Sequence, residues 1–186
     1  MSSKLAVIVA STREGRFADT VVRWFMEQVG QRVDFDVQLI DLRDLKLHPV
    51  LDVEDPQRDR LLEWIGAADA FVVVTPEYNH GYPAALKHAI DCVYEEWRAK
   101  PVAFVSYGGM AGGLRAVEQL RQVFAEMHAP TMRDAVSFHS CYEQFDDDGR
   151  PINSEQVNGA AKVMLDQLEW WATALRNARV ARPYAA

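Results

Sequence analysis

Cysteine is scarce in this chain, and so are the other features that mark a secreted or membrane-bound protein. Cys92 and Cys141 are the two cysteines among 186 residues, too few for a disulfide framework and without the spacing of metal ligands. The apolar run at residues 5–10 is too short for the hydrophobic segment of a signal peptide or for a membrane span. We therefore expect a cytoplasmic protein with no membrane association and no bound metal.

Positive charge is also in short supply. The chain has 20 Lys and Arg against 27 Asp and Glu, which gives a formal net charge of -7. Nucleic acids and anionic membranes attract proteins through an excess of Lys and Arg, so neither is an expected partner. Because 49% of the residues are hydrophobic and 25% charged, the composition is globular, and the length fits a single domain over residues 1–186.

What the chain does contain is a regular alternation of strands and helices. Continuous apolar runs at residues 5–10, 70–74 and 102–105 indicate strands buried on both faces, as in a parallel sheet covered by helices. Residues 34–39 and 135–138 alternate polar and apolar side chains instead, which suits edge strands. The second and fifth strands are therefore predicted at the edges, and the strand order 2-1-3-4-5 has this arrangement.

The segments between the strands have helical periodicity. A second helix is predicted to start at Asp55-Pro56, with Asp as N-cap, and a fifth near Asn153, with Gln156 placed for a capping box. Five helical stripes are expected to face the sheet: Phe17, Val21, Val22, Phe25 and Val29; Leu61, Leu62 and Ile65; Leu86, Ala89, Ile90, Val93 and Trp97; Leu114, Val117, Leu120, Phe124 and Met127; Val157, Ala161, Met164, Leu165, Leu168 and Leu175. The predicted fold is an α/β protein, a three-layer α/β/α sandwich around a five-stranded parallel sheet.

Several common phosphate-binding sites are excluded by missing motifs. The chain has no G-x-x-x-x-G-K-[ST] sequence and no G-x-G-x-x-G after the first strand. A phosphate-accepting receiver domain shares the strand order but needs acidic residues after the first strand and an Asp at the end of the third. Residues 10–12 (Ala-Ser-Thr) and 75–76 (Thr-Pro) replace them.

The loop after the first strand nevertheless has the composition of an anion site. Residues 11–16 (Ser-Thr-Arg-Glu-Gly-Arg) lead directly into a helix, whose N-terminus carries partial positive charge. Arg13 and Arg16 are unfavourable there unless an anion such as a phosphate lies between them and the helix. The alternative is a solvated loop in which Glu14 and Asp19 pair with the two arginines.

Two further loops follow central strands and are predicted to meet the first at the same end of the sheet. Residues 75–83 (Thr-Pro-Glu-Tyr-Asn-His-Gly-Tyr-Pro) offer aromatic and amide groups to a planar ring, and residues 106–113 contain four glycines that let the backbone approach a flat ligand. Either loop alone is weak support, because a loop Tyr is usually packed and glycine pairs often serve only as turns.

Taken together, these segments resemble the NADPH-dependent FMN reductase family, which includes quinone, azo-dye and chromate reductases. The resemblance lies in residues 11–16, 75–79 (Thr-Pro-Glu-Tyr-Asn), 86–91 (Leu-Lys-His-Ala-Ile-Asp) and 106–109 (Ser-Tyr-Gly-Gly). It implies a flavodoxin-like fold, bound FMN, and NADPH or NADH as co-substrate, with a small-molecule electron acceptor such as a flavin, a quinone, an azo compound or a metal oxyanion.

The resemblance also implies a role for each loop. The FMN phosphate would be held by Ser11, Arg13, Arg16 and the backbone near Phe17 and Ala18. The ribityl chain and ring would be lined by Pro76, Glu77, Tyr78 and Asn79. The pyrimidine edge of the ring would be contacted by Ser106, Gly108 and Gly109, with the N–H groups of the two glycines stabilising negative charge on the reduced ring.

The family pattern is broken at two places on the acceptor side of the pocket. His88 replaces the usual Asn, and His80-Gly81 replaces the Ser of many members. Because the flavin carries the chemistry, no catalytic side chain is required. His80 could donate a proton to a quinone, although a lone loop His is more often solvated.

Exposed aromatic residues suggest self-association. Trp170 and Trp171 are adjacent and cannot both face one core stripe, and Tyr94 and Trp97 lie near the end of the third helix. A homodimer or homotetramer is expected, as in the family; amphipathic Trp residues on a monomer surface are the alternative. Two other functions stay open: a non-enzymatic FMN-binding electron carrier or redox-sensing interaction protein, and a protein that keeps the fold but has lost flavin and holds another phosphate ligand in the same site.

Overall fold

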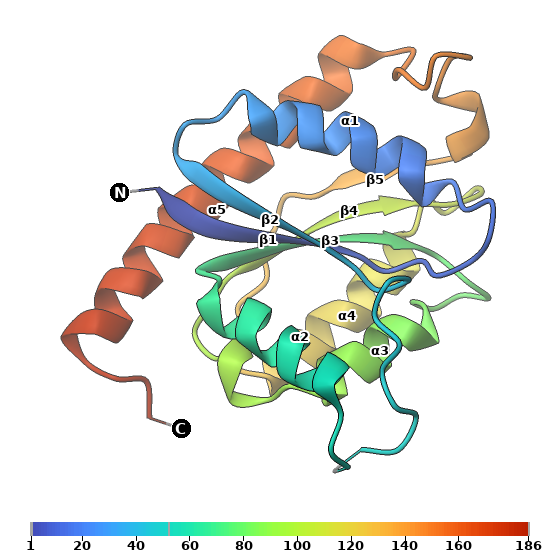
Figure 1. The fold of residues 1–186 in the computed structure, drawn as a ribbon. Coiled ribbons are helices and arrows are strands. Elements are labelled where there is room, and N and C mark those ends of the chain that lie inside the picture. Colours follow the sequence, from blue (N-terminus) through green and yellow to red (C-terminus); the bar gives the residue numbers. More distant parts are fainter. Residues whose placement is uncertain (1, 52, 186) are drawn as a thin grey trace.

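The computed structural model describes residues 2–51 and 53–185 as five strands and five α-helices in alternation, with two short 3-10 helices (Figure 1). The strands are β1 (Ser3–Val9), β2 (Phe35–Asp41), β3 (Ala70–Pro76), β4 (Val102–Tyr107) and β5 (Val136–Phe138). The helices are α1 (Ala18–Gly30), α2 (Pro56–Ala67), α3 (Ala84–Asp91), α4 (Leu114–Glu126) and α5 (Ser154–Ala181), and the 3-10 helices are η1 (Glu95–Trp97) and η2 (Cys141–Glu143).

The strands form one parallel sheet in the order β2-β1-β3-β4-β5, which confirms the prediction. All residues of β3 and β4 are buried, whereas β2 leaves several side chains partly or fully exposed and β5 has three residues. Continuous apolar runs therefore occupy the centre of the sheet, and the alternating segments lie at its edges.

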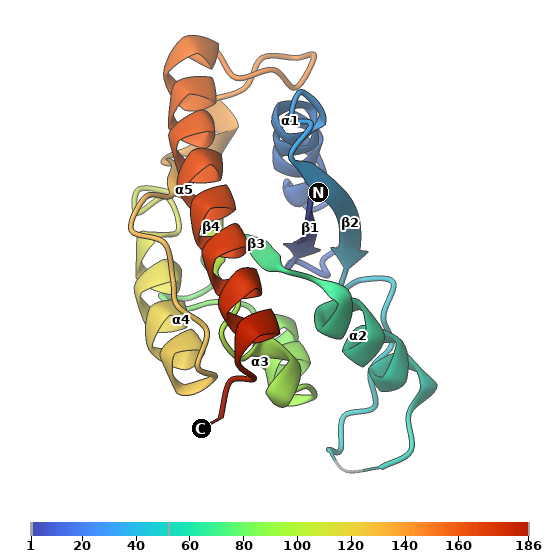
Figure 2. The same cartoon turned by 90° about the vertical axis from the view of Figure 1, so that its left-hand side faces the viewer.

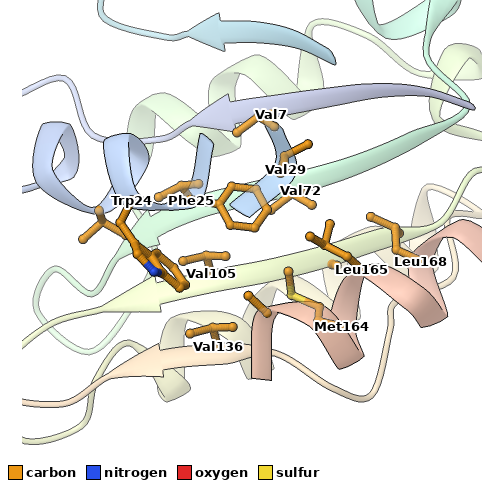
Figure 3. Close-up of a cluster of buried hydrophobic side chains, with 14 of the residues drawn as sticks. Val7, Trp24, Phe25, Val29, Val72, Val105, Val136, Met164, Leu165 and Leu168 are labelled. Atoms are coloured by element: carbon orange, nitrogen blue, oxygen red, sulfur yellow. The ribbon is translucent and has the colours of Figure 1, made fainter. Parts of the chain in front are cut away.

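Helices cover both faces of the sheet. α1 and α5 lie on one face and α2, α3 and α4 on the other (Figures 1 and 2). Successive residues of a strand point to opposite faces, so Val7 packs beneath α1 and α5 while Ile8 packs against the opposite layer. In Figure 3, Phe25 of α1 and Leu165 of α5 meet the valines of the central strands.

The two cysteines belong to different layers of this core. Cys92 lies in the cluster on the α2, α3 and α4 side, and Cys141 in the cluster on the α1 and α5 side. Both thiols are free and buried, with 6% and 2% of each residue exposed. Burial raises the pKa of each thiol.

Some details of the helices differ from the prediction. α3 ends at Asp91, so Trp97 lies on η1 instead. Its ring is buried there, and the centres of the Trp97 and Phe71 rings are 4.7 Å apart. Leu62 and Leu114 are exposed on their helices rather than facing the sheet. Asp55 caps α2 as predicted, accepting a hydrogen bond from the N–H of Gln57.

The capping box expected at the start of α5 does not form, because the two side chains bond each other instead of the helix backbone. The Asn153 amide donates to the Gln156 side chain at 2.6 Å, and neither side chain bonds the helix backbone. The side chains satisfy each other and leave the first N–H groups of α5 uncapped. No helix in the described ranges is both long and apolar enough to cross a lipid bilayer.

Candidate functional site

A cavity of about 360 Å³ lies where β1, β3 and β4 end. In an open parallel sheet this end, near the reversal of strand order, is where ligands bind. Its walls come from the first loop, the loop after β3, the glycine loop after β4 and η2. The lining residues are Arg13, Glu14, Gly15, Arg16, Phe17, Pro76, Glu77, Tyr78, Tyr107, Gly108, Gly109, Cys141 and Tyr142.

The structure thus brings together most of the residues singled out from the sequence. Four of them do not line this cavity: Ser11, Ala18, Asn79 and Ser106. Five others line it that were not predicted to contact a cofactor: Glu14, Gly15, Tyr107, Cys141 and Tyr142. Tyr142 is 78% exposed and lies with its ring 4.9 Å from that of Phe17, at the open side of the cavity.

The beginning of α1 forms one wall of the cavity. Phe17 is the N-cap residue and makes no side-chain capping hydrogen bond, and the first N–H groups of a helix have no partner within it. Gly15 reaches this point with φ at +60°, in the left-handed region. The wall therefore carries uncapped N–H donors and the positive end of a helix dipole.

Arg13 adds a full positive charge to this wall. Its side chain is exposed and forms no ion pair or hydrogen bond with any residue in the described ranges. The guanidinium carbon lies 3.6 Å from the centre of the Tyr78 ring, close enough for a cation–π contact. Tyr78 is fixed in turn by a 2.6 Å hydrogen bond between its hydroxyl and that of buried Ser11.

Arg16 differs from the expected phosphate ligand. Its side chain is 3% exposed and donates to Asp19, to Asp41 and to the Ser11 carbonyl. These bonds use all five N–H groups of the guanidinium, and the bond to Asp41 is the main cause of a raised Arg16 pKa. The alternative of pairing with acidic residues thus holds for Arg16 through Asp19, while Arg13 stays available.

Tyr107, a residue of the cavity wall, has a hydroxyl group whose hydrogen bonds are not satisfied by the described residues. Its residue is 4% exposed, and its hydroxyl is buried without a hydrogen-bond partner among the described residues. Burial raises the pKa of this phenol, so the hydroxyl stays protonated and able to donate. A buried donor without a partner destabilises the protein, and a ligand oxygen in the cavity would satisfy it.

The glycine loop after β4 corrects two expectations. The Ser106 hydroxyl is fully buried and donates to the Gly112 carbonyl at 2.8 Å, so it shapes the loop from beneath. The N–H of Gly108 donates to the Phe138 carbonyl, which leaves it unavailable to a reduced ring. The N–H of Gly109 donates to no described residue, although its carbonyl accepts from Gly112 and Ser140, and the space beside its Cα is open.

The loop after β3 turns back tightly on itself. Tyr78 and Gly81 exchange two backbone hydrogen bonds, and Asn79 and His80 between them have φ at 49° and 74°. This is the geometry of a type I′ turn. His80 is exposed, does not line the cavity, and is held through its carbonyl by the Gln119 amide.

Glu77 lines the cavity, but its carboxylate is engaged elsewhere. The side chain is 6% exposed, and its oxygens accept from the guanidinium and the N–H of Arg115 in the first turn of α4. His88 points away from the cavity, where its ring meets the His48 carbonyl at 2.8 Å. In residues 2–51 and 53–185, no three His, Cys, Asp or Glu side chains gather to form a metal site.

The sheet order and the cavity at its carboxyl end define a flavodoxin-like protein. Comparison with known sequences narrows this class. The model of the NADPH-dependent FMN reductase family matches residues 3–143, and the chain belongs to that family.

Curated relatives agree with this assignment, and a solved structure shares the fold. An NAD(P)H-dependent FMN reductase of Schizosaccharomyces pombe is 39% identical over 71% of this chain and 72% of its own length. A quinone reductase of Pseudomonas putida is 32% identical over 90% of this chain and 93% of its own. The fold matches FerB, an NAD(P)H:(acceptor) oxidoreductase of Paracoccus denitrificans, at a TM-score of 0.73 and 22% identity, covering 92% of this chain and 98% of that one.

Proposed function

We propose that this protein is an NAD(P)H-dependent oxidoreductase that holds FMN in the cavity at the ends of β1, β3 and β4. FMN, when bound, would supply the redox chemistry, a two-electron transfer from NADPH or NADH to a small-molecule acceptor. Quinones and free flavins are the acceptor classes that the names of the relatives suggest.

The proposal depends most on the arrangement around Arg13. The Arg13 guanidinium, which has no ion pair or hydrogen bond with a described residue, and an uncapped helix N-terminus face the same cavity. Each attracts anions, and together they suit a phosphate monoester. Tyr107 fits the same ligand, since its buried hydroxyl has no acceptor among the described residues.

The other walls suit a flat ring and an open reaction face. Pro76 and Tyr78 give an apolar and aromatic surface, and Gly109 offers an N–H beside open space. Tyr142 at the rim is exposed. We therefore place the nicotinamide, and after it the acceptor, on the solvent side of the ring, with Ser11, Asn79 and Ser106 supporting the loops rather than contacting the cofactor.

The direct test is to bind FMN to the purified protein and then supply NADPH, NADH and a quinone. We expect FMN to bind and the mixture to oxidise the nicotinamide with turnover. Binding without turnover with either nicotinamide would favour an electron carrier. The proposal would be overturned if the protein did not quench FMN fluorescence on titration while another phosphate ligand stabilised the protein.

Three further features belong to the proposal. Residues 1–186 act as one domain.

The protein forms a homodimer or homotetramer, because Trp170 and Trp171 of α5 are 63% and 40% exposed, with ring centres 5.3 Å apart. Trp97 is buried and does not take part. A cytoplasmic location fits the two free thiols. Light scattering that gave a monomer mass at micromolar concentration would contradict the oligomer.

A further inference from the structure

Arg16 connects the first loop to the neighbouring edge strand. Two of its nitrogens donate to the two carboxylate oxygens of Asp41, the last residue of β2, with Nη1 2.7 Å from Oδ1. The same Nη1 donates at 2.5 Å to the Ser11 carbonyl. The guanidinium thus joins the start of the loop to a carboxylate that no sequence motif includes.

Asp41 is well placed to hold this contact. It pairs in register with Val9, the last residue of β1, and the next N–H along the chain, that of Leu42, donates to the Val9 carbonyl. Burial would raise the pKa of Asp41, but the hydrogen bonds from Arg16 and from the Arg43 N–H outweigh it and lower the pKa. The carboxylate is therefore ionised and anchored on a strand of the sheet.

We infer that Asp41 and Arg16 form a positioning pair that shapes residues 11–16 so that Arg13 and the α1 N-terminus face the FMN phosphate. This inference rests on the proposed function. Arg16 itself does not contact the phosphate, because its five N–H groups are already bound to protein oxygens. The pair acts on the phosphate end of the ligand and leaves the ring surface at Pro76 and Gly109 untouched.

The two possible roles of Arg16 predict opposite effects of removing Asp41. If Arg16 bound the phosphate directly, Asp41→Asn would release the guanidinium, and FMN would bind as tightly as before or more tightly. If the pair positions the loop, Asp41→Asn and Arg16→Gln should each weaken FMN binding by about tenfold, the usual scale for a lost charged hydrogen bond. The double variant should then be no worse than either single one.

The experiment measures FMN and riboflavin affinity by flavin fluorescence in the wild type, the three variants and Asp41→Glu. Riboflavin lacks the phosphate, so a positioning pair should change its affinity by less than about twofold, while Asp41→Glu, which keeps the charge, should recover most of the FMN affinity. Asp34→Asn is the matched control: it removes a carboxylate paired with Arg32 just before the other end of β2, and should leave both affinities unchanged.

Each outcome decides between the two roles. FMN affinity that is unchanged or higher in Asp41→Asn, or an equal loss of riboflavin affinity, would overturn the positioning pair. Far-UV circular dichroism checks that each variant is folded. If Asp41→Asn is not, a crystal structure of the wild-type protein with FMN decides, because an Arg16 guanidinium that has left Asp41 to bond the phosphate would overturn the positioning pair. Wild-type protein that fails to bind FMN would instead reject the proposed function.

Discussion

The hydroxyl groups of Ser11 and Tyr78 lie 2.6 Å apart and join the loop after β1 to the loop after β3. Because Ser11 is fully buried, loss of the bond would leave its hydroxyl without this partner. Tyr78→Phe should therefore lower the free energy of unfolding by about 1 kcal/mol. The aromatic face beneath Arg13 would be kept.

Urea denaturation checks this prediction, with Tyr142→Phe as the control. Tyr142 is also a cavity residue, but it is 78% exposed and its hydroxyl has no hydrogen bond to a described residue. The control should unfold like the wild type. Equal destabilisation of both variants would show that the Ser11 contact is not the cause.

Tyr107→Phe should have opposite effects on the free and the FMN-bound protein. Removing a buried hydroxyl that has no partner among the described residues should stabilise the free protein by about 1 kcal/mol, because the cost of burying that hydroxyl disappears. FMN should bind the variant less tightly, since a donor to the ligand is lost. Thermal unfolding with and without FMN measures both effects, and a destabilised free protein would contradict the assignment.

Arg13→Ala should weaken FMN binding by about 1–3 kcal/mol, the usual contribution of a hydrogen bond to a charged group. The loss should shrink as salt is added, because the contact is partly exposed. Titration with FMN at two salt concentrations measures it. Arg133→Ala is the control, since Arg133 is 92% exposed and lies outside the cavity lining; unchanged affinity in Arg13→Ala would remove Arg13 from the phosphate site.

Lys100 should make the free energy of unfolding rise with pH in the alkaline range. Its ammonium is buried under the last turn of α2, where it donates to the Ile65 and Gly66 carbonyls at 2.8 Å, and burial lowers its pKa from 10.5 to about 8. Between these two values the unfolded chain binds more protons than the folded one, so unfolding becomes harder as pH rises. The neutral amine still has two N–H groups for the two carbonyls.

Urea denaturation between pH 7 and 10 tests this, with Lys100→Met compared to the wild type at each pH. From pH 7 to 10 the free energy of unfolding of the wild type should rise relative to that of Lys100→Met by on the order of 2 kcal/mol. Titrations of Cys and Tyr are common to both proteins and cancel. Lys162→Met, at a side chain that is 73% exposed, should show no such trend, and a flat difference for Lys100→Met would contradict the lowered pKa.

The architecture could be predicted from sequence because the burial of each strand is visible in its residues. The run at 70–74 has no polar position and occupies the centre of the sheet, whereas residues 34–39 alternate and lie mainly in edge strand β2. The predicted position of Trp97 on the third helix is wrong for a related reason. It continues the apolar spacing of α3, but the chain leaves the helix at Asp91 and returns the ring to the core through η1.

The cavity was predicted in its loops but not in the direction of every side chain. Arg16 and Arg13 look equivalent in sequence, and their difference depends on Asp41, which is distant along the chain and adjacent only once β1 and β2 pair. For Tyr107 the sequence does contain a signal. As the last residue of a buried strand, its side-chain direction was fixed by alternation, toward the same face as Val105.

Cys92 and Cys141 lie in core layers on opposite sides of the sheet. Burial shields Cys92 from alkylating reagents, whereas Cys141, although buried, also lines the cavity. Labelling of Cys92 would therefore report unfolding without any engineered probe, and labelling of Cys141 should slow further when a ligand fills the cavity. Conversely, a cysteine introduced at an exposed position such as Val33, which is 96% exposed, should take up a fluorophore selectively while the two native thiols stay protected.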